Sequence, residues 1–67
     1  MMEKLTRADA LAIAGAVDRA KTDKSRRRLA IEFARDVLSA IQQGRCTDQK
    51  FCARLVVKSW RQAGLIR

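Results

Sequence analysis

Residues 29–44 read LAIEFARDVLSAIQQG, and the alternation of apolar and polar side chains in this stretch decides the fold. Apolar residues recur at steps of three and four, as they do along one face of an α-helix. That face consists of Ala30, Phe33, Ala34, Val37, Leu38 and Ile41. Gly44 follows, and glycine is the residue type that most often ends a helix in a left-handed conformation. The pattern predicts one long amphipathic helix over 23–43.

A shorter helix is predicted upstream, over 6–20. Thr6 and Asp9 have the spacing of a capping box, in which each residue accepts a hydrogen bond from the backbone of the other. The apolar face of this helix is Ala10, Ile13, Ala14, Val17 and Ala20. Residues 21–25 contain neither glycine nor proline, so one continuous helix over 6–43, forming a long helical hairpin dimer, is the alternative.

A third helix is predicted over 47–63. Thr47 is a suitable N-cap, and the spacing of Cys46 and Phe51 is that of a hydrophobic staple around it. Gly64 predicts the end of the helix. The predicted inward face consists of Cys52, Leu55, Val56, Trp60 and Ala63.

These elements predict an all-α protein with a single domain over 1–67. The helices at 23–43 and 47–63, joined by a turn of about three residues, resemble a helix-turn-helix, whose second helix enters the major groove of DNA. Residues 52–67 are also similar to the recognition helix of winged-helix bacterial regulators. The helix over 23–43 is longer than the one that precedes such a recognition helix, so we assign no family.

The short chain favours a homodimer. A domain of 67 residues buries only about 60% of the surface that its unfolded chain exposes, so its core alone stabilises it weakly. Steps of four and three on the long helix suit either an intrachain core or a partner helix. The candidate dimer seam is Ala30, Ala34, Val37 and Ile41.

Charge restricts the kind of partner. The chain has 15 Lys and Arg against 7 Asp and Glu, a formal net charge of +8. Such a surface attracts nucleic acid, acidic proteins or anionic membranes. No apolar run reaches the length of a membrane span or has the form of an export signal, so we expect a cytoplasmic protein that does not bind membranes.

The residue types argue against catalysis. The chain contains no histidine and no tyrosine, and it has no glycine-rich phosphate loop. Cys46 and Cys52 are too few to make a four-ligand zinc site, and we interpret both as small packing residues. We therefore expect no enzyme activity, no metal and no cofactor.

Two groups of cations are candidate binding residues. The first, here called the basic stripe, recurs at steps of four, four and three with no acidic residue between its members, which are Lys50, Arg54, Lys58 and Arg61. The second, the arginine cluster, is Arg26, Arg27 and Arg28. Cations oppose the dipole at a helix N-terminus, so local stability does not explain that cluster, whereas a bound polyanion does. The alternative for both groups is a solvated, solubilising surface.

The sequence therefore favours a small DNA-binding regulator of transcription that binds double-stranded DNA through the basic stripe. Ten arginines against five lysines fit a GC-rich bacterium, or a phage or plasmid that lives in one. The alternative is a non-catalytic inhibitor or adaptor, such as a phage anti-activator, that docks on an acidic surface of a host protein.

Overall fold

The computed structural model describes residues 3–66, which form three helices and no strand. The helices are α1 (Arg7–Asp18), α2 (Asp23–Gln42) and α3 (Gln49–Gln62). The predicted all-α class and the three predicted helices are confirmed, with every boundary within two residues of its expected place. None of the helices in the described part of the chain is long and apolar enough to cross a membrane.

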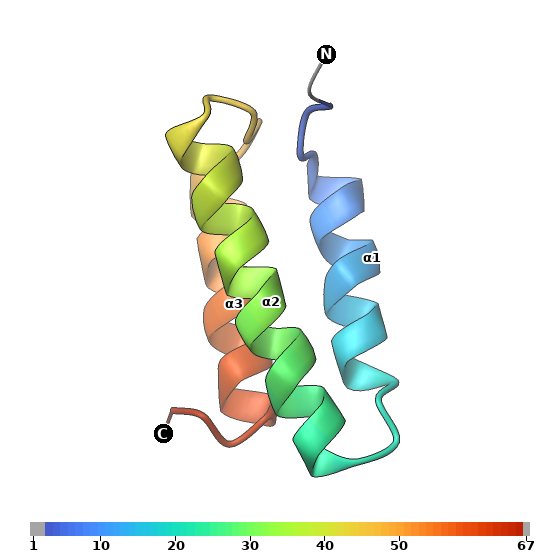
Figure 1. The fold of residues 1–67 in the computed structure, drawn as a ribbon. Coiled ribbons are helices and arrows are strands. Elements are labelled where there is room, and N and C mark those ends of the chain that lie inside the picture. Colours follow the sequence, from blue (N-terminus) through green and yellow to red (C-terminus); the bar gives the residue numbers. More distant parts are fainter. Residues whose placement is uncertain (1–2, 67) are drawn as a thin grey trace.

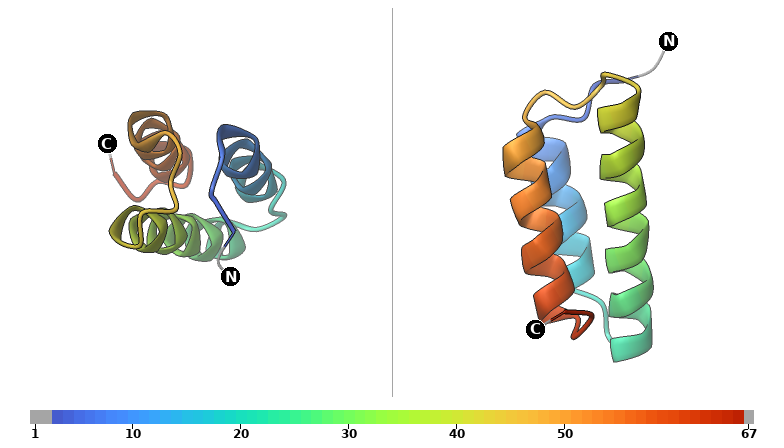
Figure 2. Two further views of the ribbon diagram at one scale, coloured as in Figure 1. Left: turned by 90° about the horizontal axis from the view of Figure 1, so that it is seen from above. Right: turned by 90° about the vertical axis from the view of Figure 1, so that its left-hand side faces the viewer.

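The helices lie side by side as a bundle (Figure 1). α1 and α3 run in the same direction and α2 runs in the opposite one, so the chain goes down, up and down. Seen along the bundle, the helices occupy the corners of a triangle (Figure 2), and each packs against both others. One side of every helix therefore faces a common core, and the opposite side faces solvent.

The chain turns sharply between α1 and α2, so the continuous helix over 6–43 is wrong. Thr22 has an extended backbone, and its hydroxyl accepts a hydrogen bond from the backbone N–H of Ser25 at 3.1 Å. An Arg26 guanidinium nitrogen donates to the Ala20 carbonyl at 2.9 Å, which supplies that carbonyl with a donor at the turn. Local capping thus breaks the helix although no glycine or proline is present.

The predicted caps at the other helix ends are mostly present. Thr6 and Asp9 form the full capping box. Gly44 and Gly64 both have positive φ angles, +71° and +77°. After Gly64, the backbone N–H of Leu65 donates to the Trp60 carbonyl at 2.9 Å, the hydrogen bond of a Schellman motif. These ends are set by short-range hydrogen bonds.

The N-cap of α3 differs from the prediction. Asp48, rather than Thr47, accepts the hydrogen bond from the backbone N–H of Phe51, at 3.1 Å. Thr47 is engaged elsewhere, since its backbone N–H donates to the Leu5 carbonyl at 3.0 Å. With Asp48 as the N-cap, Cys46 and Phe51 no longer occupy the two positions of the predicted hydrophobic staple. The connection between α2 and α3 has six residues instead of about three.

One end of the bundle is closed by backbone pairing between distant segments. Leu5 and Cys46 form an isolated parallel bridge, and the Leu5 N–H donates to the Arg45 carbonyl at 2.9 Å. The Arg45 guanidinium also donates to the Glu3 carbonyl at 2.8 Å. The segment before α1 is thereby attached to the loop before α3.

The core is built largely from small side chains. Its buried apolar residues are Ala10, Ala14, Val17, Ala30, Phe33, Val37, Ala40, Cys52 and Ala63. Most of the candidate dimer seam belongs to this intrachain core, because Ala30 and Val37 are buried in it and Ile41 packs against it, while Ala34 is half-buried. Leu38, expected in the core, is 56% exposed, and Ala40 takes a buried position instead.

Candidate nucleic-acid interface

The basic stripe lies on the solvent side of α3. All four of its cations are exposed, whereas Cys52 and Ser59 of the same helix, and Ala63 at its C-cap, are buried on the opposite side. The helical register explains the division, because residues three or four apart share a side. Residues 3–66 contain two ion pairs, and neither involves a cation of the stripe.

α3 is held in place by polar contacts as well as by packing. The indole N–H of Trp60 donates to the Ala30 carbonyl at 2.9 Å, which ties the second half of α3 to the first half of α2. Trp60 also packs against the core, as expected from the sequence, together with Leu65. At the other end, the Asp48 carboxylate forms an ion pair at 2.6 Å with Arg7 of α1. The stripe is therefore presented on a helix fixed at both ends.

A shallow depression lies within the solvent side of α3. Its volume is about 460 Å³, and most of its lining surface is apolar. The lining residues are Ala53, Arg54, Val57, Lys58, Arg61 and Gln62. Val57, which is 42% exposed, and Ala53 supply apolar surface between the charged side chains. The surface thus combines cations with a small apolar centre.

The arginine cluster is divided by the fold. Arg26 is turned inward, with 27% of its side chain exposed, and it pairs with Asp23 at 3.0 Å and with the Ala20 carbonyl. Arg27 and Arg28 are exposed. Arg26 therefore stabilises the start of α2, and the two residues after it are free to meet a partner.

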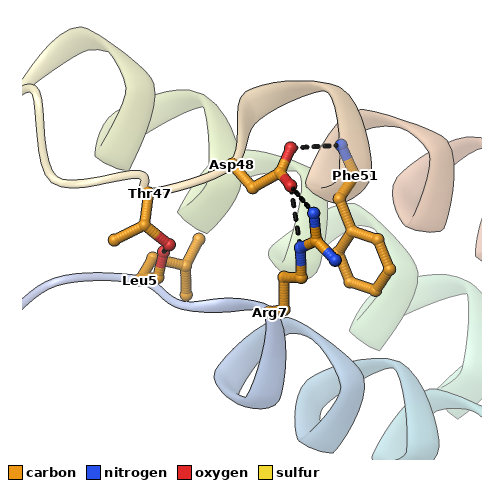
Figure 3. Close-up of polar contacts among 5 residues, drawn as sticks. All are labelled: Leu5, Arg7, Thr47, Asp48 and Phe51. Atoms are coloured by element: carbon orange, nitrogen blue, oxygen red, sulfur yellow. Dashed lines mark hydrogen bonds and ion pairs between the residues drawn. The ribbon is translucent and has the colours of Figure 1, made fainter.

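Sequence reasoning missed two residues beside the stripe, Arg7 and Asp48. Arg7 extends from α1 to the start of α3, where its Nε donates to Oδ2 of Asp48 at 2.8 Å (Figure 3). The pKa of Asp48 lies below its usual value, first because of the backbone N–H of Phe51 and then because of Arg7, with a smaller effect of the Arg54 charge. No local pattern signals this pairing, because the two residues are 41 positions apart.

Both cysteines are free thiols in or beside the core. Cys52 is fully buried and Cys46 is half-buried. Burial, together with a hydrogen bond to the Cys46 thiol, raises the pKa of Cys52 to about 11. A thiol with such a pKa is protonated at neutral pH and is a poor nucleophile. In residues 3–66 no group of three or more His, Cys, Asp or Glu side chains is arranged to hold a metal ion.

Comparison of the chain with protein-family models, curated proteins and solved structures finds no match.

Proposed function

We propose that this chain is a non-catalytic DNA-binding protein, a small regulator of transcription that binds duplex DNA through the basic stripe of α3. One observation carries the proposal: the four cations of the stripe are all exposed on the side of α3 that faces away from the core, on a helix with no acidic residue. Such a surface attracts the phosphates of DNA, and its binding releases the counterions that surround them.

The dimensions of α3 support a groove-binding role. Its 14 residues correspond to about 21 Å at a rise of about 1.5 Å per residue. The major groove of B-DNA is about 12 Å wide and accepts an α-helix. α3 is one corner of a triangular bundle, so its outer side can approach a groove ahead of the other two helices. Arginine and lysine there can contact either phosphates or guanine edges.

The exposed members of the arginine cluster are suited to phosphate contacts next to that groove. The hydrogen bond from Trp60 to Ala30 brings the start of α2 beside the end of α3. Arg27 and Arg28 lie on the second turn of α2 and are exposed. A phosphate backbone that passes Arg61 at the end of α3 can therefore reach them.

A salt titration tests the proposal. A labelled 20-base-pair duplex of mixed sequence is titrated by fluorescence anisotropy between 50 and 200 mM salt. The double variant Arg54→Ala, Lys58→Ala should reduce the slope of log affinity against log salt by about 1.8, since each lost phosphate contact removes about 0.9. The matched control, Lys4→Ala with Arg35→Ala, loses the same charge from exposed positions outside the stripe and should keep most of the slope. Equal slopes for the two double variants would contradict the proposal.

A second candidate function is docking on an acidic surface of a host protein. The observation in its favour is the apolar depression around Ala53 and Val57, which is surrounded by cations. An apolar centre with a polar rim is typical of protein interfaces. In this role the chain would be an inhibitor or adaptor, and the cations would accelerate association with an acidic partner.

Val57→Ser separates the two functions. The change removes apolar surface from the centre of the depression and leaves every cation in place. A DNA-binding role predicts duplex affinity within about twofold of wild type. A protein-binding role predicts that a glutamate-rich amphipathic helical peptide binds the wild type better than the variant, while the duplex binds neither tightly.

We further propose that the protein acts in the cytoplasm as a homodimer. Because the seam on α2 is already used by the intrachain core, a dimer has to use another surface. Among residues 3–66, the large apolar side chains left exposed are Leu11, Ile31, Leu38 and Val57.

A further inference from the structure

Arg7 is the side chain of α1 that reaches the start of α3 (Figure 3). Its Nε and one terminal nitrogen both contact Oδ2 of Asp48, at 2.8 and 2.6 Å. Its guanidinium also lies 5.1 Å from the centre of the Phe51 ring, a cation–π distance. Despite these contacts, 66% of the Arg7 side chain is exposed. The guanidinium is thus held in one place and still faces solvent.

Arg7 lies next to the basic stripe. The ring beneath it belongs to Phe51, and Arg54 and Lys58 follow Phe51 by three and seven positions on α3. Residues at this spacing lie on the same side of a helix. The charge of Arg54 also contributes, as the smallest effect, to the lowered pKa of Asp48. Arg7 therefore extends the cationic surface of α3 toward α1.

Asp48 has two opposing effects at this place. As the N-cap it stabilises α3, and through its second oxygen it holds Arg7. Its negative charge, however, lies at the N-terminal end of the stripe and attracts the same cations that a phosphate needs. An arginine held by stacking and pairing loses less conformational freedom on binding than a free one. The pair therefore positions Arg7 while it reduces the positive potential around it.

We propose that Arg7 is a further phosphate-binding residue of the α3 surface and that Asp48 partly masks it. The inference rests on the proposed DNA-binding function and adds to it a residue from another helix. A phosphate that approaches the start of α3 contacts the exposed edge of the Arg7 guanidinium together with Arg54, against the pull of the Asp48 carboxylate.

Two variants with opposite expected effects on affinity test the inference. Arg7→Gln removes the charge, and Asp48→Asn removes the opposing charge while asparagine keeps the N-cap. Both break the same ion pair, so a purely structural role predicts that both lower stability and that neither changes the affinity of the folded protein. A binding role predicts weaker duplex binding for Arg7→Gln and tighter binding for Asp48→Asn. The exposed Arg35→Gln has the same charge loss as Arg7→Gln and is the control.

The measurement is anisotropy with the 20-base-pair duplex at a temperature where circular dichroism shows every variant folded. The ratio of wild-type to Arg7→Gln affinity should decrease about threefold from 50 to 200 mM salt, as expected for one lost phosphate contact. Arg7→Gln binding equal to Arg35→Gln, or unchanged or weaker binding by Asp48→Asn, overturns the inference. If Arg54→Ala with Lys58→Ala weakens binding in that case, the proposed function survives alone. If wild type does not bind the duplex, both fail together.

Discussion

Phe33 is the largest fully buried side chain of the bundle, so its substitution tests most directly how the core is packed. It is 0% exposed at the middle of α2. Five of the nine buried apolar residues in the described part of the chain are alanines, which have little side chain with which to fill a cavity. Phe33→Ala should therefore leave a cavity that the surrounding residues cannot fill.

The expected loss is large relative to the stability of so short a chain. Truncation of a buried phenylalanine to alanine costs about 3 to 5 kcal/mol. Typical stabilities of about 0.05 to 0.15 kcal/mol per residue imply a total of about 3 to 10 kcal/mol for 67 residues. At about 4 to 8 °C per kcal/mol for a domain of this size, the variant should melt at least about 12 °C below wild type or be unfolded at room temperature.

Urea unfolding followed by circular dichroism and by the fluorescence of Trp60, the one tryptophan, measures the effect. Leu38→Ala is the matched control, because Leu38 is on the same helix and 56% exposed. It should change stability by about 0.5 kcal/mol or less. A Phe33→Ala protein that is as stable as the Leu38→Ala protein would refute this description of the core.

Three further predictions concern assembly and titration. Mass measurement at micromolar concentration should give a dimer, and a sharp monomer would contradict this. Val37→Asp should unfold the chain, because Val37 is 3% exposed and a buried charge there has no partner. A Val37→Asp protein that stays folded would contradict this expectation. Hydrogen bonds from the backbone hold the pKa values of Asp9 and Asp48 below 3.8 in the folded state. The contribution of these carboxylates to stability is therefore present above pH 3.8 and should be lost as the pH falls through their lower folded-state pKa values. An acid titration followed by circular dichroism checks this. The pH dependence from Cys52 has the opposite sign, because burial raises the pKa of this thiol from 9.0 to about 11. Its contribution to stability is complete below pH 9.0 and should be lost toward pH 11. A Cys52→Ala variant should lack this alkaline loss of stability.

The sequence predicted the parts of the fold that depend on neighbours along the chain. The capping box of Thr6 and Asp9 is satisfied within one helical turn, and the positive φ angles of Gly44 and Gly64 follow from the absence of a side chain. Such signals do not depend on the rest of the molecule. They were sufficient to predict three helices and the exposed positions on α3.

Positions at the edge of an apolar face were predicted less well. Leu38 and Ala40 lie on opposite edges of the apolar face of α2, and hydrophobicity favours Leu38 for the core. The structure buries Ala40 and exposes Leu38, because the side of α2 that becomes buried depends on where α1 and α3 pack. The helical period defines an apolar face, and only the neighbouring helices define its limits.

The sequence by itself favoured three helices, with a continuous helix over 6–43 left open, and it predicted the helix ends to within two residues and the charge of the surface, since these depend on short-range hydrogen bonds and on composition. Only the tertiary structure decided that Asp48 caps α3 and that Arg7 lies beside the basic stripe. The two residues are 41 positions apart, and they meet because the pairing of Leu5 with Cys46 closes one end of the bundle. A contact between distant segments depends on the packing of all three helices and leaves no periodic signal in the chain.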